Sequence, residues 1–143
     1  MVDVSAKAAT ARVARAEASL RLPEAVRRQA MAGELQKGDA LTVARIAAIM
    51  AAKETARLIP LCHPLCLSHV QVDFEARGQD EIAILVEART VGETGVEMEA
   101  MTAAAVAALT LYDMVKGACR EARIEGVALV HKSGGKSGDW NRA

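Results

Sequence analysis

The hydrophobic and polar pattern of the first sixty residues predicts a strand followed by two helices. Residues 13–20 alternate small apolar and charged side chains and are predicted to form a strand. A first helix is predicted to begin at Leu22-Pro23-Glu24 and to end near Ala32, because Gly33 stops it. After a loop at residues 37–39, a second helix is predicted over residues 41–58, closed by Pro60. The apolar residues at helical spacing that indicate it are Val43, Ile46, Ala47, Met50 and Ala51.

The second half of the chain predicts a hairpin, a long helix and a last strand. Residues 70–75 alternate apolar and polar side chains, residues 77–80 favour a turn, and residues 81–90 form the returning strand. A long helix is then predicted over residues 96–122, and a strand over residues 127–132. The pattern therefore predicts one α+β domain over residues 1–143, an antiparallel sheet with helices packed on one face.

Length and composition fit one domain that builds its own core. The chain has 143 residues, of which 52% are hydrophobic. Aromatic residues are scarce, with one each of Trp140, Tyr112 and Phe74, and alanine is abundant. Small side chains bury little area per residue, so a monomer gains little stability from its core. This composition favours an oligomer.

Charge and cysteine content narrow the classes of partner. The formal net charge is zero, so the whole-chain signature of a nucleic-acid-binding protein is absent. No signal peptide opens the sequence, and no apolar run reaches the roughly 18 residues that a membrane span needs. Three cysteines without the spacing of a disulfide framework fit a reducing compartment. We expect a cytoplasmic protein with neither nucleic acid nor membrane as partner.

The first candidate for chemistry is the loop around Cys62 and His63. Pro60 and Pro64 stiffen it and fix the direction of the imidazole and the thiol. A positioned histidine suits proton transfer or hydrogen bonding to a ligand, whereas a histidine that bonds a backbone carbonyl is the structural alternative. A zinc site is a third reading, with Cys62, His63, Cys66 and His69 as its ligands. We disfavour it because no second Cys/His cluster completes the set.

The second candidate is a group of charges on the long helix. Glu97 and Glu99 lie at its start, where carboxylates complement the helix dipole. Asp113 and Lys116 lie three residues apart on one face, as either a functional pair or an exposed salt bridge. The 16 positions from residue 97 to residue 113 turn a helix by about 160°. Either the helix begins after Glu97, or the two groups serve pockets made with another chain, which we favour.

The C-terminal segment is rich in glycine, serine and lysine. Its Gly135-Lys136-Ser137 run is not a P-loop, because Val130 stands where the earlier glycine is required and no helix follows. Its lysines are able to bind phosphate as point charges, and a plain solvated tail is the alternative. We expect the tail near residues 132–143 to be mobile unless a ligand orders it.

Six motifs, in order over essentially the whole chain, together resemble one family. The short ones are Met-Val-Asp-Val-Ser at residues 1–5, Lys-Gly-Asp at 37–39 and Tyr-Asp-Met at 112–114. The long ones are Ile-Pro-Leu-Cys-His-Pro-Leu at 59–65, Thr-Gly-Val-Glu-Met-Glu-Ala at 94–100 and Lys-Ser-Gly-Gly-Lys-Ser-Gly at 132–138. With these motifs the chain resembles the cyclic pyranopterin monophosphate synthase (MoaC) family of molybdenum cofactor biosynthesis.

The resemblance implies a ferredoxin-like α+β fold and a homohexamer, a trimer of dimers, with active sites between subunits. It implies a lyase that converts (8S)-3′,8-cyclo-7,8-dihydroguanosine 5′-triphosphate, supplied by an upstream radical-SAM enzyme, to cyclic pyranopterin monophosphate and pyrophosphate. It implies no required cofactor and no protein-bound metal, and it leaves room for Mg²⁺ accompanying the triphosphate.

The resemblance also implies residue roles. Asp113 and Lys116 would be the acid–base pair, with Lys37 beside them. The residues implied to bind the ring and sugar are Leu61, Cys62, His63, Glu97, Met98 and Glu99. Lys132, Lys136 and Arg12 would contact the triphosphate, since polyphosphate needs cations. The competing function is a non-catalytic regulatory α+β domain that binds a nucleotide or another small molecule.

Overall fold

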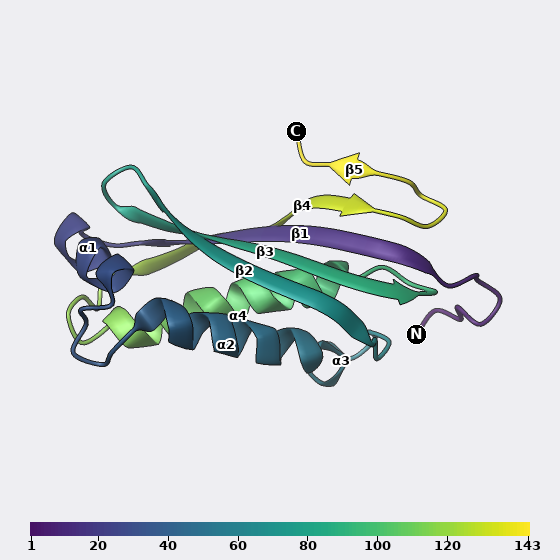
Figure 1. The fold of residues 1–143 in the computed structure, drawn as a ribbon, viewed down its shortest axis with the longest axis horizontal. Helices are drawn as coiled ribbons and strands as arrows, with labels where there is room; N and C mark the ends of the chain where they lie inside the picture. The colour runs from purple at the N-terminus through teal and green to yellow at the C-terminus, as the bar shows by residue number, and fades with distance from the viewer.

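A five-stranded antiparallel sheet forms one layer of the computed structural model, which describes residues 1–143 (Figure 1). The strand order is β2-β3-β1-β4-β5, and every neighbouring pair is antiparallel. The strands are β1 (Thr10–Arg21), β2 (Leu67–Arg77), β3 (Glu81–Gly92), β4 (Arg123–Ser133) and β5 (Trp140–Asn141).

Two long helices cover one face of this sheet (Figure 1). The helices are α1 (Glu24–Ala32), α2 (Ala40–Lys53), α3 (Thr55–Leu58) and α4 (Glu97–Val115). Ahead of β5, the chain runs as a strand, a helical crossover, a hairpin, a second helical crossover and a last strand, which is the ferredoxin-like connection. The predicted α+β class, with helices on one face, is confirmed.

Alternation along the strands places the core between the sheet and the helices. On β1 the buried residues are Ala14, Ala16, Ala18 and Leu20; on β3 they include Ile82, Ile84, Val86 and Ala88. The helices contribute buried alanines to this core, which include Ala44, Ala48, Ala104 and Ala108. Side chains of this size let α2 and α4 pack closely against each other and against the sheet.

The second predicted helix differs from the structure in length and in orientation. It is divided at Glu54 into α2 and α3, where the backbone dihedrals of Glu54 leave the helical region (φ −101°, ψ 6°). The large apolar residues that indicated it point outward: Val43, Ile46 and Met50 are 43%, 55% and 62% exposed. The alanines take the core face, because only small side chains fit the close contact with the alanines of α4.

The long helix α4 begins at Glu97 and ends at Val115, seven residues before the predicted end at Ala122. After Val115 the chain continues as a turn, in which the amides of Ala118 and Cys119 both donate to the Val115 carbonyl. By length and composition α4 could cross a membrane, but 56% of its apolar window is buried inside the fold. It packs against α2, β1, β3 and β4, as a core helix does.

The C-terminal segment carries a short strand that the sequence did not indicate. Lys132 and Ser133 end β4, and Trp140–Asn141 pair with His131 and Lys132 as β5. The intervening loop turns through three glycines with positive φ, at positions 134, 135 and 138. The mobility of residues 132–143 stays a prediction.

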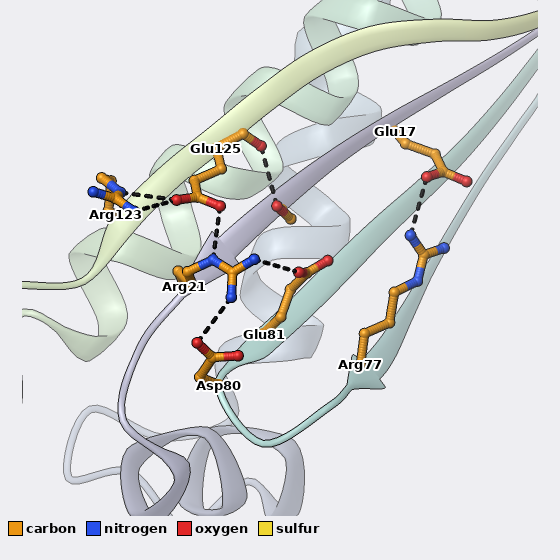
Figure 2. A network of polar contacts seen from close by, with 8 residues as sticks. Glu17, Arg21, Arg77, Asp80, Glu81, Arg123 and Glu125 are labelled. Atoms are coloured by element: carbon orange, nitrogen blue, oxygen red, sulfur yellow. Dashed lines mark hydrogen bonds and ion pairs between the residues drawn. The ribbon is translucent and has the colours of Figure 1, made fainter. Parts of the chain in front are cut away.

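The other face of the sheet is polar, and its charged side chains form ion pairs with one another (Figure 2). Arg21 on β1 forms ion pairs with Asp80, Glu81 and Glu125, and Arg77 pairs with Glu17. The Nη1 to Asp80 Oδ2 distance is 2.8 Å, and the Nε to Glu125 Oε2 distance is 2.7 Å. These pairs join β1 to both of its neighbours, so the network supports strand register.

Candidate active site

A cavity of about 400 Å³ lies where α4 begins. Leu61, Cys62 and His63 reach it from the loop after α3, and Glu97, Met98 and Glu99 reach it from the first turn of α4. The six residues that the resemblance assigned to ring and sugar binding therefore line one space. They come from segments more than thirty residues apart in the sequence, and the fold brings them together.

Local structure explains how these groups are held. Gly95 leaves room for Glu97, because a Cβ at position 95 would lie 1.9 Å from Glu97 Oε2. The Thr90 hydroxyl of β3 donates to the Cys66 carbonyl at 2.7 Å, which ties the Cys62–His63 loop to the sheet. The sheet and α4 thus fix both sides of the cavity.

Two carboxylates in this cavity have different surroundings. Glu99 is 4% exposed, and burial, with a smaller contribution from Glu97, raises the pKa of its carboxyl. Burial also raises the pKa of the neighbouring Cys62 thiol, with Glu99 as the second cause. The two raised pKa values favour the uncharged forms of the Glu99 carboxyl and the Cys62 thiol. Both forms are able to hydrogen-bond to a polar ring.

Glu97 instead pairs with a lysine. Lys132 Nζ lies 3.1 Å from Glu97 Oε1 and 3.4 Å from Ser137 Oγ. Arg12 and Lys132 line a small cavity of about 10 Å³ that shares Gly95 and Glu97 with the large one, so the two adjoin. Arg12 Nη2 donates to the Glu93 carbonyl at 3.3 Å, whereas its buried Nε has no partner.

Lys136 is placed differently. It is exposed on the loop between β4 and β5, lines neither of these cavities and forms no ion pair. Of the three cations assigned to the triphosphate, Arg12 and Lys132 are therefore adjacent and Lys136 stands apart.

Asp113, Lys116 and Lys37 form a second cluster, at the other end of α4. Lys116 Nζ lies 2.5 Å from Asp113 Oδ1, and Lys37 Nζ lies 3.0 Å from Asp113 Oδ2 and 2.8 Å from the Asp113 carbonyl oxygen. Hydrogen bonds from Lys116 and then Lys37 lower the pKa of Asp113, and the bond to Asp113 raises the pKa of Lys116. All three side chains are about half exposed, so the cluster faces solvent in the single chain.

The two clusters do not meet within one chain. Glu97 and Asp113 lie on the same unbroken helix, which rules out a helix that begins after Glu97. Their 16 positions span about 24 Å along its axis. A single small ligand in the large cavity is therefore out of reach of Asp113 from the same chain.

The Cys/His loop does not gather into a metal site. No group of three or more His, Cys, Asp or Glu side chains is arranged to hold a metal ion, so Cys62, His63, Cys66 and His69 do not form the ligand set that their spacing suggested.

The cavity also includes residues that the sequence analysis left without a role. Val2, Val4 and Lys7, from the segment before β1, line its wall, as do Leu65 and Thr94. The signal for the first group was the Met-Val-Asp-Val-Ser motif at residues 1–5, which helped to identify the family but suggested no chemistry by itself.

Comparisons with known proteins agree on one family. The family model described as the MoaC family matches residues 1–135. A cyclic pyranopterin monophosphate synthase from Methylobacterium is 56% identical over 141 residues, 98% of this chain and 88% of that protein. Enzymes of the same name from Corynebacterium efficiens (53%; 99% of this chain, 90% of the relative) and Listeria monocytogenes (50%; 98% and 88%) are nearly as similar. Residues of two of the six motifs, at 59–65 and 94–100, line one cavity, and the chain belongs to the MoaC family.

Proposed function

We propose that the chain is a cyclic pyranopterin monophosphate synthase, a lyase of molybdenum cofactor biosynthesis. It converts (8S)-3′,8-cyclo-7,8-dihydroguanosine 5′-triphosphate to cyclic pyranopterin monophosphate and pyrophosphate. The family membership supports the reaction, and the convergence of residues 61–63 with residues 97–99 on one cavity of about 400 Å³ carries the assignment to this site.

The cavity suits a guanine-derived ring. The ring edge offers N–H donors, which the Glu97 and Glu99 oxygens accept, and Met98 and Leu61 supply apolar contact. Arg12 and Lys132, beside the cavity, bind the triphosphate by charge-assisted hydrogen bonds. Lys136, exposed on the loop that follows Lys132, is assigned to the same phosphates.

Asp113, Lys116 and Lys37 act as the acid–base group. We assign proton transfer to this group because its carboxylate is ionised and lies within hydrogen-bonding distance of both ammonium groups. Because the cluster is about 24 Å from Glu97 in its own chain, it serves the cavity of a neighbouring chain. A homohexamer built as a trimer of dimers provides such shared sites.

The remaining requirements are simple. The enzyme needs no cofactor, and Mg²⁺ enters only as a companion of the triphosphate. It works in the cytoplasm on the product of a radical-SAM enzyme, which gives it a functional link to that enzyme.

Turnover tests this proposal. Purified protein supplied with the cyclic dihydro-GTP compound, without reductant, should release one pyrophosphate for each cyclic pyranopterin monophosphate formed. Binding of the compound without pyrophosphate release would instead favour the non-catalytic regulatory domain.

A further inference from the structure

A second cavity, of about 280 Å³, shares two lining residues with the large one. The shared residues are Leu65 and Glu99, so these two side chains separate the cavities. The other lining residues come from the junction of α2 and α3 and from the loop that follows, and they are Ala52, Lys53, Glu54, Ala56, Arg57 and Pro64. Its charged lining residues at the junction are exposed, so the second cavity opens to solvent there.

Hydrogen bonds hold the walls of the second cavity in place. The buried Thr55 hydroxyl donates to the Ala51 carbonyl at 3.1 Å, which fixes α3 against the end of α2. The Ile59 amide donates to the Thr55 carbonyl at 2.8 Å. On the other side, the bond from Thr90 to the Cys66 carbonyl holds the chain just after Leu65. The second cavity is therefore built into the fold and does not depend on the placement of long surface side chains.

Glu99 is the polar part of the boundary between the two cavities. It is buried and takes part in none of the ion pairs of the structure. Burial, and then the charge of Glu97, raises the pKa of its carboxyl, so this group holds a proton more readily than an exposed glutamate. The other titratable residues that line the two cavities are Lys7, Cys62, His63 and Glu97 on one side and Lys53, Glu54 and Arg57 on the other.

A ligand in the large cavity leaves the second cavity as the route from solvent to Glu99. Under the proposed function the ring fills the large cavity and covers that side of the carboxyl, and a filled site excludes water. The second cavity stays open, and its volume of about 280 Å³ exceeds the roughly 30 Å³ that one water molecule takes in the liquid. Water and small buffer acids are therefore able to reach Glu99 while the ligand is bound.

We propose that the second cavity is a solvent inlet through which Glu99 recovers a proton that it gives to the bound ring. This inference rests on the proposed function. The O–H bond of the Glu99 carboxyl breaks as its proton passes to a basic nitrogen or oxygen of the ring, which leaves a carboxylate. A hydronium ion or a buffer acid in the second cavity then protonates this carboxylate, and the conjugate base returns to solvent. The exchange needs no other reactant.

Chemical rescue by formate tests the inlet. Glu99→Ala removes the carboxyl and leaves a space between the two cavities, which a formic acid molecule is able to enter and in which it replaces the lost proton donor. Pyrophosphate release is measured over a series of formate concentrations, at low and at saturating substrate. Glu99→Gln is the control, because its amide fills the same space and does not supply a proton.

Glu99→Ala and Glu99→Gln should each lower kcat by about a hundredfold, the scale for a lost proton donor. Formate should raise kcat of Glu99→Ala by about tenfold or more and should leave Glu99→Gln unchanged. The recovery should persist at saturating substrate, because formate enters through the second cavity and not through the occupied one. Absence of recovery, or recovery that disappears as substrate saturates, would overturn the inference.

A substitution that narrows the second cavity gives an independent measurement. Ala56 lines the second cavity and not the large one, so Ala56→Leu obstructs only the inlet. Ala47→Leu is the matched control, since Ala47 is a half-buried helical alanine that lines neither cavity. In the Glu99→Ala background, Ala56→Leu should abolish the recovery by formate and Ala47→Leu should preserve it. Equal recovery in the two double variants would overturn the inlet.

The wild type keeps failure of the inlet distinct from failure of the proposed function. If the wild type releases pyrophosphate from the substrate but formate does not act as described, only the inlet is wrong. If the wild type does not turn over the substrate, the proposed function itself is wrong. Thermal unfolding of each variant shows whether the fold is intact. Should Ala56→Leu fail to fold, the substrate dependence of the recovery in Glu99→Ala still decides the question.

Discussion

Glu97 and Asp113 stand at opposite ends of one unbroken helix, α4, about 24 Å apart along its axis. Glu97 lines the large cavity, and Asp113 is bonded by two lysines outside it. Under the proposed function, Glu97 belongs to the binding end of each chain and Asp113 to its chemical end. A complete site would then combine the binding end of one chain with the chemical end of another.

The Asp113 cluster should matter for rate far more than for stability. Lys116→Ala and Asp113→Asn are each expected to lower kcat by about a hundredfold or more, the range for lost acid–base groups. Melting temperatures should stay near the wild-type value, because the side chains are about half exposed. The double variant should lose much less than the product of the two single losses, since the groups act as one unit. Near-normal turnover in both single variants would falsify the assignment.

Glu99 should make stability depend on pH. Its pKa in the folded chain is raised above 4.5 by burial, so the folded state holds this proton to a higher pH than the unfolded chain does. Its contribution to stability is fully present below pH 4.5 and is lost as pH rises through the raised folded pKa. Urea unfolding of wild type and Glu99→Gln over a pH series should therefore show the wild type losing stability relative to the variant as pH increases. A constant difference between the two proteins would contradict the buried, proton-holding state of Glu99.

Asp113, unlike Glu99, should not make the folded state less stable as pH rises. Its pKa is lowered below 3.8 by the two lysines, so its stabilising contribution is present above that pH and is lost only as pH falls through the lowered value. The Asp113→Asn variant and the wild type should then differ in stability by a constant amount from pH 5 upward. Urea unfolding of both proteins over the same pH series measures this difference in stability.

Gly134 should be the least replaceable glycine of the C-terminal loop. Its φ is +92°, and a Cβ there would lie 2.0 Å from the Ala11 carbonyl oxygen, which belongs to the backbone and cannot move aside. Gly138 has a similar positive φ (+64°) but no atom within 4 Å, so Gly138→Ala isolates the conformational cost, about 1–2 kcal/mol. Gly134→Ala should cost more than this in thermal unfolding and should also weaken pyrophosphate binding, because it displaces the end of β4 that carries Lys132. Equal effects of the two substitutions would mean that the loop is not held against β1.

Local sequence signals predicted most of the fold. Alternation over residues 70–75 and the turn at residues 77–80 located the hairpin, the strand predicted over residues 127–132 lies within β4, and Gly33, with φ of +73°, ends α1 as predicted. The orientation of α2 was not predictable in this way, since the identity of the packing partner decides which face is buried. Because α4 presents alanines, Val43, Ile46 and Met50 lie on the outer face and the alanines of α2 lie inside. The prediction missed the end of α4 at Val115 because it extended the apolar pattern past Gly117, two residues after the helix ends.

The candidate site was predictable in its residues and not in its arrangement. Motifs gave the members of both clusters, and the helical angle between Glu97 and Asp113 indicated that one chain would not unite them. The position of Lys7 in the cavity wall was not predictable from the sequence, because it depends on a turn at Asp3–Ser5 and on the distant loop that carries His63. The pairing of Lys132 with Glu97 likewise depends on contact between β4 and the start of α4.

Activity in mixed oligomers tests most directly whether the two clusters act as one site across two chains. Glu97→Ala and Asp113→Ala, each expected to be inactive alone, are mixed under conditions in which labelled subunits are shown to exchange, and pyrophosphate release is measured. A shared site predicts recovery, because some pockets then combine an intact Glu97 with an intact Asp113 from different chains. Exchange without any recovery of activity would contradict the shared site.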